Sequence, residues 1–386
     1  MRLEPPASED PRDVLRALRA AVLGAGPAVA LGGSDLPNEV PPGTAAVVTT
    51  SGSTGVPKSV VLSRNALISS AYATAARIGE GSWLLAVPAT YVAGVQVMVR
   101  ALLADHEPAV VAGPFRPEPF AAAALGMASH ADGVSVPRFT SLVPAQLQRL
   151  LDAAEHDDAV AQALRSFEAI LIGGQALAPA VSERAEAAGA RIVRTYGSSE
   201  TSGGCVYDGV PLEGVGMAIV DGEVRLSGPT LADGYLGDPE RTASVFPTDA
   251  DGTRWYRTGD GGEIRDGVLH VTGRLDNVIV SGGVNVSLDR VEAAVRGIPG
   301  LESAVVVPIL DADWGQGSAV VVPGIAASRE RALLTEVRDV VGAAVGAPAR
   351  PARVVAIEEL PTLSSGKPDR ASLRRALGEG GPKPRD

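Results

Sequence analysis

The sequence predicts an α/β protein: a large N-terminal domain of layered sheets and helices, followed by a small C-terminal α+β lid domain joined to it by a hinge. Up to about residue 197, short apolar segments alternate with helical patterns, which is typical of parallel α/β layers. Near residue 212 the pattern changes to short β segments with turn signals, and a new series of strands and helices begins after residue 277. We place the boundary between Leu275 and Asp276, so the domains are residues 1–275 and 276–386. The second of these domains is large enough to fold alone.

The first domain begins with a helix over residues 11–23, where apolar residues recur at helical spacing. Residues 45–50 form a buried strand that leads into a loop rich in Gly and Ser. Ser63 is a good N-cap for a helix that ends near Arg77. Further strands, each except the last followed by a helix, are expected at 83–88, 109–112, 139–143, 168–174 and 191–197.

The rest of the chain is expected to contain more β structure. Asp266 and Gly267 are suited to the two central positions of a hairpin turn. In the small domain the apolar spacing predicts helices over 287–297, 330–345 and 370–377, and strands over 301–309, 318–324 and 352–360.

Composition excludes several classes of protein. The net charge of −11 argues against a protein that coats nucleic acid or binds anionic membranes. No apolar window reaches 18 residues, so we expect no membrane span. The N-terminus has no signal-peptide pattern, and a single cysteine, Cys205, fits a reducing cytoplasm. We expect Cys205 to be a small buried residue, and the four isolated histidines suggest no metal site.

The chain has only three lysines among its 34 cationic residues. Codon bias explains the excess of arginine most simply, but a lysine that persists can mark a place where a compact point charge is needed. Lys58 and Lys367 lie in loops rich in Gly and Ser, whereas Lys383 lies in a polar tail. Chance survival on the surface suits Lys383 and suits the other two poorly.

The loop TSGSTGVPK at residues 50–58 has the composition of a phosphate-binding loop. Small residues let backbone N–H groups converge on phosphate oxygens, and the hydroxyls and Lys58 add donors and charge. A Walker A loop is excluded, because Pro57 stands where that motif requires its second glycine. The sequence therefore indicates a phosphate loop of another kind, with a mobile surface linker as the alternative.

Five motifs in one order resemble those of the adenylate-forming superfamily, which includes acyl- and aryl-CoA ligases, luciferases and amino-acid adenylation domains. They are TSGSTGVPK (50–58), YGSSET (196–201), YRTGD (256–260), GRLDNVIVSGGVNVS (273–287) and PTLSSGKPDR (361–370). Ser59 and Val280 depart from the usual Gly and Lys, and the first subdomain is much reduced. The strings at 92–103, 140–151 and 199–212 most resemble short actinobacterial-type o-succinylbenzoate–CoA ligases of menaquinone biosynthesis.

The resemblance implies an enzyme with two half-reactions at one site: a carboxylic acid and ATP give acyl-AMP, and CoA then takes the acyl group. It implies that Glu200 ligates Mg²⁺, that Tyr196 stacks on adenine and that Asp260 binds the ribose. The ATP-binding residues that it implies are Thr50, Ser51, Gly52, Ser53, Thr54, Gly55, Lys58, Gly174, Gln175, Ala176, Tyr196, Gly197, Ser199, Asp260 and Arg274. From the pattern alone, a plain turn aspartate is the favoured interpretation of Asp260, and the segment 173–176 is equally well a strand-to-helix turn.

The small domain is implied to be a mobile lid. Lys367 is the expected catalytic lysine of adenylation, and Asp276 is the expected hinge. Gly282 and Gly283 are expected to let the thin pantetheine arm of CoA approach the backbone. The alternative for Lys367 is a solvated loop lysine.

For the acid, we predict that Arg100 pairs with the second carboxylate of a dicarboxylic substrate, while Thr90 and Tyr91 contact its aryl ring. A solvated helix arginine is the alternative for Arg100. The expected partners are small molecules only, namely the acid, ATP and CoA, and a homodimer stays open. Rival functions are another acyl- or aryl-CoA ligase, an enzyme that loads a carrier protein, and an inactive binding homologue.

Overall fold

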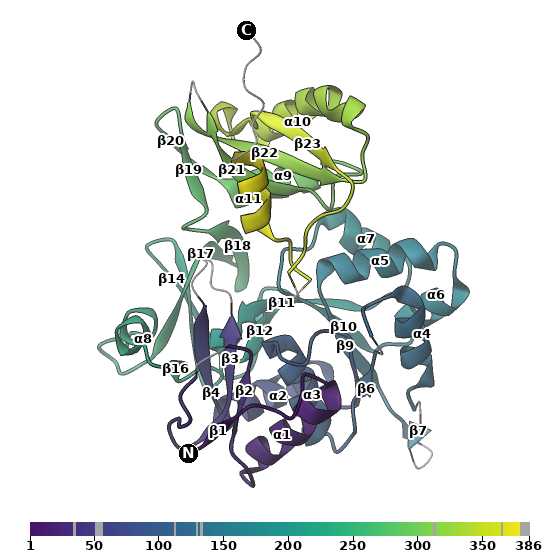
Figure 1. Ribbon diagram of the computed structural model, residues 1–386, viewed down its shortest axis with the longest axis vertical. Helices are drawn as coiled ribbons and strands as arrows, with labels where there is room; N and C mark the ends of the chain where they lie inside the picture. The colour runs from purple at the N-terminus through teal and green to yellow at the C-terminus, as the bar shows by residue number, and fades with distance from the viewer. Residues whose placement is uncertain are drawn as a thin grey trace.

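The chain folds into a large lower part and a smaller upper part, as Figure 1 shows for a computed structural model. The structure describes residues 1–33, 36–50, 57–111, 113–128, 130–131, 134–311, 314–363 and 366–378. The predicted fold class is confirmed: layered sheets and helices make up the large part, and a compact α+β unit makes up the small one.

A seven-stranded sheet forms the centre of the large part. Its strand order is β13 (Val210–Pro211), β12 (Gly203–Tyr207), β11 (Ile192–Ser198), β10 (Ala169–Ile172), β9 (Arg138–Leu142), β5 (Ser82–Leu85) and β6 (Ala109–Val110). From β11 to β6 all neighbours are parallel, as the strand–helix alternation predicts.

Side chains of this sheet alternate between two apolar cores. Trp83 and Leu85 contribute to one core, and Leu84 contributes to the other. The core that contains Leu84 is shared with α4 (Pro117–Gly126), α5 (Pro144–Ala154), α6 (Asp158–Arg165) and α7 (Pro179–Ala187). The other is shared with α1 (Pro11–Leu23), α2 (Arg64–Ile78) and α3 (Val92–Leu103). The sequence analysis missed α6, a helix of two turns. Its apolar side, including Val160 and Leu164, packs into the core that contains Leu84.

A five-stranded sheet lies next to α1 and carries the predicted phosphate loop. Its order is β1 (Leu3–Glu4), β2 (Ala28–Leu31), β3 (Thr44–Thr50), β4 (Lys58–Ser63) and β16 (Gly234–Tyr235). Strands β3 and β4 are antiparallel, and Thr50 is opposite Lys58. The loop therefore joins the ends of two paired strands, although residues 51–56 themselves lie outside the described residues.

The remaining β structure of the large part is a four-stranded antiparallel sheet of β14 (Gly216–Val220), β15 (Glu223–Ser227), β17 (Trp255–Arg265) and β18 (Val268–Arg274). The predicted hairpin turn joins β17 to β18, and both turn residues have the positive φ that it requires: 51° at Asp266 and 78° at Gly267. The minor elements described in this part are α8 (Pro239–Val245), the short 3-10 helix η1 (Ser199–Thr201) and the ribbon of β7 (His130–Ala131) and β8 (Val134–Ser135).

The small part is a five-stranded sheet with helices on both faces. Its strands are β19 (Val278–Ser281), β20 (Val284–Ser287), β21 (Val305–Asp311), β22 (Gly315–Pro323) and β23 (Arg353–Ile357). Helices α9 (Leu288–Arg296) and α10 (Glu330–Ala344) pack on one face, and Leu373 of α11 (Arg370–Gly378) packs on the other. The chain changes sheets between Arg274 and Val278. The exact boundary at Leu275–Asp276 stays a prediction.

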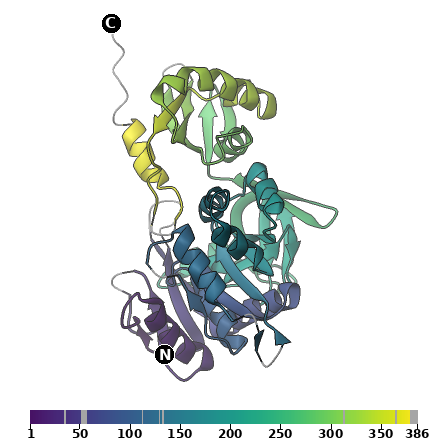
Figure 2. The same ribbon diagram turned by 90° about the vertical axis from the view of Figure 1, so that its right-hand side faces the viewer.

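The segment before α11 leaves the small part and descends to the large one (Figures 1 and 2). It reaches the carboxyl ends of β9 and β10, the edge at which open parallel sheets usually bind ligands. No helix among the described residues is long and apolar enough to cross a membrane.

Candidate functional site

A buried carboxylate lies where β4 meets the end of β11. Glu200, in the short 3-10 helix η1 (Ser199–Thr201) after β11, is 2% exposed. Lys58, the first residue of β4, forms an ion pair with its Oε1 atom. The Tyr235 hydroxyl donates to the same oxygen at 2.8 Å, and the Lys58 ammonium lies 5.4 Å from the centre of the Tyr235 ring. Three distant segments therefore build one charged cluster.

This arrangement keeps Glu200 ionised. Burial alone would raise the pKa of its carboxyl group. The charge of Lys58 and the hydrogen bonds from Lys58 and Tyr235 together lower this pKa by more than burial raises it, so it lies below its usual value. A carboxylate that stays charged in the interior can bind a cation.

A second cluster joins β11 to the four-stranded sheet. The Tyr196 hydroxyl donates to Asp260 Oδ2 at 2.6 Å, and Arg274 donates to Asp260 Oδ1 at 3.3 Å. Burial raises the pKa of Asp260, while Tyr196 and Arg274 act to lower it. The structure thus brings together all three of these predicted nucleotide-binding residues.

Arg274 also binds the residue predicted as the hinge. Its guanidinium forms two bonds of 3.0 Å with the Asp276 carboxylate and donates to the Thr258 carbonyl at 2.7 Å. Arg274 therefore ties the nucleotide cluster to the segment where the chain passes into the small part.

The lid loop places Lys367 at the edge of the central sheet. Its Cε and Nζ atoms lie 3.3 and 3.9 Å from the position that a Cβ atom at Gly174 would occupy, and Gly366 lies near Val143. Part of the Lys367 side chain stays exposed, but the surrounding protein lowers the pKa of its ammonium by desolvation. The structure therefore brings the predicted catalytic lysine to the predicted segment 173–176, which contains Gln175 and Ala176.

The lid loop is anchored in the small domain. Arg370 donates to the Val306 carbonyl and to Glu292, each at 2.8 Å. Asp369 caps the following helix through the amide and hydroxyl of Ser372. The position of Lys367 is therefore set by the packing of the small domain.

Arg100 is buried and not solvated, so the surface alternative for it is wrong. It is 7% exposed, lies over the Trp83 ring at 5.0 Å and donates to the Tyr207 hydroxyl at 3.4 Å. The structure does not bring it together with Thr90 and Tyr91, because they precede α3 whereas Arg100 lies near its other end, about 13 Å along the axis at 1.5 Å per residue. An acid pocket that includes all three residues must run along α3.

The two glycines predicted for CoA differ in their surroundings. A Cβ atom at Gly282 would overlap the ring of Trp314, whose carbonyl accepts the Gly282 N–H at 3.0 Å. Gly283 has a φ of 82° and open space around it. Both lie in the turn between β19 and β20, distant in sequence from the clusters above.

The remaining predicted residues are placed as follows. Ser199 is buried beside Glu200, Gly197 packs closely against the backbone of Gly203, and the buried Thr50 hydroxyl has no partner among the described residues. Ser51, Gly52, Ser53, Thr54 and Gly55 lie outside the described residues. Cys205 is fully buried as expected, and burial raises its pKa to about 12.

The described residues contain no group of three or more metal-ligating side chains of the His, Cys, Asp or Glu type. Glu200 nevertheless suits Mg²⁺, a hard cation that is often held by one or two carboxylates together with substrate phosphates. The unpartnered hydroxyl of Thr50, the last residue before the predicted phosphate loop, fits such a use.

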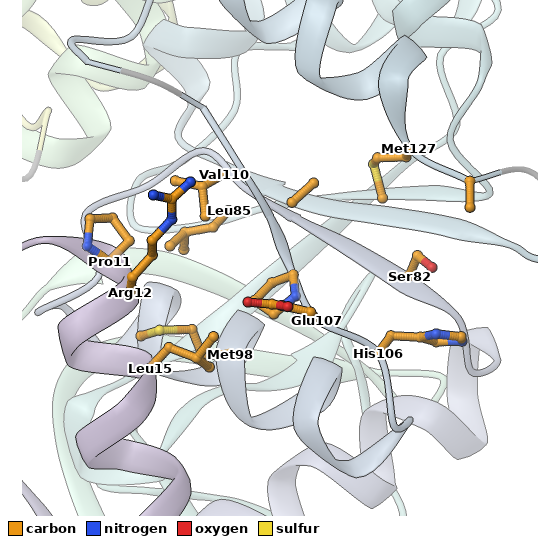
Figure 3. Close-up of a pocket in the computed structure, with 13 residues that line it drawn as sticks. Pro11, Arg12, Leu15, Ser82, Leu85, Met98, His106, Glu107, Val110 and Met127 are labelled. Atoms are coloured by element: carbon orange, nitrogen blue, oxygen red, sulfur yellow. The ribbon is translucent and has the colours of Figure 1, made fainter.

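A cavity of about 550 Å³ lies elsewhere, between α1, α3 and the β5–β6 edge (Figure 3). Leu15, Leu85 and Met98 line it together with Arg12, His106 and Glu107. None of the predicted site residues lies in it.

Sequence reasoning missed Tyr235. It reaches Glu200 because β16 pairs with β4, with Tyr235 opposite Val60. The one sequence signal that could have indicated a role for Tyr235 is the presence of an aromatic residue in a stretch rich in Gly and Asp.

Comparison with known protein families decides the family. The AMP-binding enzyme family matches residues 6–236, and its C-terminal domain matches residues 290–367. The chain belongs to the AMP-binding enzyme family. This confirms the resemblance to adenylate-forming enzymes that was inferred from the five motifs.

Relatives of this AMP-binding enzyme point in one direction. A Mycobacterium tuberculosis protein described as a probable 2-succinylbenzoate–CoA ligase is 38% identical over 401 aligned positions, which cover 98% of each chain. The 2-succinylbenzoate–CoA ligase of Escherichia coli is 32% identical over 69% of this chain and 55% of its own. An arginine-to-lysine variant of E. coli MenE with bound OSB-AMS is similar in structure, with a TM-score of 0.69 and 25% identity over 90% of this chain and 72% of that one.

Proposed function

We propose that the protein is an Mg²⁺-dependent, AMP-forming acid–CoA ligase that acts on 2-succinylbenzoate (o-succinylbenzoate) in menaquinone biosynthesis. The main support is the position of Lys367, which the small domain holds beside Gly174, at the same sheet edge as Glu200 and the Tyr196–Asp260 pair. The names of the relatives support the choice of acid.

In the first half-reaction, an oxygen of the acid's carboxylate attacks the α-phosphorus of ATP and pyrophosphate leaves. Two anions meet, so cationic groups must offset the charge. Lys58 binds the β- and γ-phosphates, and Lys367 stabilises the negative charge that develops at the α-phosphate. Mg²⁺, held by Glu200, would supply further charge neutralisation.

Asp260 and Tyr196 orient the nucleoside in this scheme. The Asp260 carboxylate accepts hydrogen bonds from the ribose hydroxyls, and Arg274 keeps that carboxylate in place. Arg100 pairs with the second carboxylate of the acid. This carboxylate is the only full negative charge of the acid away from its reacting end.

In the second half-reaction, the CoA sulfur attacks the acyl carbon, the thiol loses its proton and AMP leaves. We propose that the small domain turns about Asp276 between the two steps. The turn that carries Gly282 and Gly283 then lines the path of the pantetheine arm, and Lys367 moves away.

The test is pyrophosphate release across a panel of acids, followed by mass analysis of the CoA product. We expect 2-succinylbenzoate to give the highest kcat/KM and amino acids to be inert. A tenfold preference for benzoate or a fatty acid would contradict the proposed substrate. Acyl-AMP formation without a CoA thioester would instead indicate a carrier protein as acceptor.

A further inference from the structure

Two donors share one oxygen of the buried Glu200 carboxylate. The Tyr235 hydroxyl donates to Glu200 Oε1 at 2.8 Å, and the Lys58 ammonium is paired with the same atom. The three residues differ in exposure: 20% of the Lys58 side chain is exposed, whereas Tyr235 is 7% and Glu200 2% exposed. Lys58 is therefore the more accessible partner of this carboxylate, and Tyr235 is the buried one.

The proposed function gives the two donors different tasks. Lys58 begins β4, directly after the predicted phosphate loop, and is assigned to the β- and γ-phosphates of ATP. These phosphates compete with Glu200 for the ammonium group. A carboxylate left in the interior without a donor is costly, because it has lost its water without a replacement. Glu200 therefore needs a donor that does not move to the substrate.

The position of Tyr235 does not depend on Lys58. The Tyr235 backbone lies in β16, which pairs with β4, and its N–H group donates to Thr242 Oγ1 at 2.9 Å. The Tyr235 ring packs against Phe246, with the ring centres 5.9 Å apart. Strand pairing and packing in the apolar core therefore hold the Tyr235 hydroxyl where it is.

Ser198 carries the other hydroxyl that acts on this carboxylate. It lowers the pKa of Glu200 less than Tyr235 does, and it donates to the Tyr256 hydroxyl at 3.3 Å. The Tyr256 ring stacks on the other ring partner of Tyr235, Phe246, at 5.4 Å between centres. Tyr256 thus carries a comparable buried hydroxyl in the same aromatic row, bonded to Ser198.

We propose that Tyr235 is a positioning residue for Glu200, an inference that rests on the proposed function. Its hydroxyl holds Glu200 Oε1 in place while the Lys58 ammonium passes from Glu200 to the β- and γ-phosphates of ATP. Glu200 then keeps one fixed donor throughout nucleotide binding. AMP lacks the β- and γ-phosphates and does not draw Lys58 away, so its binding does not require the Tyr235 hydroxyl.

The test measures the affinity of the protein for ATP with Mg²⁺ and for AMP by calorimetry, with no acid present, so that no turnover occurs. Tyr235→Phe removes the hydroxyl and keeps the ring against Phe246. Loss of a hydrogen bond to a charged group should weaken ATP binding about tenfold or more, while the affinity for AMP changes less than about twofold. The matched control, Tyr256→Phe, should leave both affinities within about twofold of the wild type.

A double-variant cycle separates positioning of Glu200 from a general structural role of Tyr235. Glu200→Met removes the carboxylate and keeps an unbranched side chain of similar length. In this background Tyr235→Phe should weaken ATP binding less than about twofold further, because the group that it holds is already gone.

Four results would overturn the proposal. They are an unchanged ATP affinity in Tyr235→Phe, an equal loss of AMP affinity in that variant, an equal loss of ATP affinity in Tyr256→Phe, and an undiminished effect of Tyr235→Phe in the Glu200→Met background. The proposed function fails separately. If the wild-type protein bound both nucleotides but released pyrophosphate with no acid of the panel, the activity would be wrong, whereas the binding comparison would still decide the role of Tyr235.

Discussion

Lys58 and Glu200 form an ion pair in which the carboxylate is buried, so each side chain depends on the other. Removing one partner of a buried pair typically costs about 3–5 kcal/mol. In Lys58→Met we therefore expect the free energy of unfolding to fall by about this amount at neutral pH.

The pH dependence of that loss has a definite sign. In the wild type the folded pKa of Glu200 is lowered, so its contribution to stability is present above the unfolded pKa and is lost as the pH falls through the folded pKa. Without Lys58, we expect burial to raise the pKa of Glu200 instead. A lower pH then protonates Glu200 and removes the cost of its buried charge in the variant. Denaturant unfolding at pH 7.5 and pH 5 should show a larger difference between the two proteins at pH 7.5. A constant difference would mean that Glu200 does not titrate in this way.

Lys367→Ala should slow acyl-AMP formation by roughly 10²–10³, the usual effect of losing one preorganised donor. ATP affinity should change little, because Lys58 and Asp260 remain. Lys367→Arg should not restore the rate, since the planar guanidinium occupies a different volume. Single-turnover kinetics of each half-reaction on both variants is the measurement. Full activity of the arginine variant would show that the scarcity of lysine reflects codon use alone.

The lowered pKa of Lys367 adds a pH signature. The ammonium is lost as the pH rises through this pKa, so adenylation by the wild type should decline at a pH below that expected for an ordinary lysine. The residual activity of Lys367→Ala should lack this decline.

Arg100→Ala should raise the KM for 2-succinylbenzoate roughly 10- to 150-fold, because a charge-assisted contact contributes about 1.5–3 kcal/mol. The KM for ATP should stay nearly constant. Steady-state kinetics with each substrate varied in turn distinguishes this from a general defect, which would affect both constants equally.

The turn between β19 and β20 illustrates control at the scale of an element. Gly282 is packed against the Trp314 ring, whereas Gly283 faces open space with a backbone that favours glycine. Substitution of either should therefore act differently.

Gly282→Val should displace Trp314 and slow thioester formation, while acyl-AMP formation stays intact. Gly283→Ala strains only the backbone, by about 1–2 kcal/mol, and should have a smaller effect on the same step. Rapid-quench measurement of both half-reactions is the check. A parallel loss of pyrophosphate release would falsify the assignment of this turn to the second step.

At the scale of the whole molecule, the polar contacts between the lid and the large domain in the described residues lie at the hinge, where Arg274 binds Asp276 and Asp289, and on α5, where Ser303 donates to Gln148 at 2.8 Å. The Lys367 loop also touches Gly174 and Val143. Such an interface can release the small domain without breaking either apolar core.

The double variant Gln148→Cys with Ser303→Cys should form a disulfide that holds the present arrangement. We expect the oxidised protein to retain acyl-AMP formation and to lose CoA transfer, with recovery on reduction. Cys205 is fully buried and does not compete for the new thiols. Mass analysis verifies the bond, and CoA transfer by the fully oxidised protein would contradict domain rotation.

Much of the fold could be predicted from local patterns. The hairpin at Asp266–Gly267 and the helix capped by Ser63 follow from residue conformational preferences that act over a few positions. Motifs placed Lys58, Glu200 and Lys367 in loops at strand ends, because a phosphate site needs backbone curvature and charge at neighbouring positions.

The tertiary structure alone determined which of these loops meet. Tyr235 reaches Glu200 through the pairing of β16 with β4, and Arg100 is buried only because α3 packs against β5 and β12. The sequence by itself determined the family, the two-part architecture and the charged residues of the nucleotide site. Burial and pairing across more than a hundred residues depend on strand order and helix packing, which no local pattern encodes.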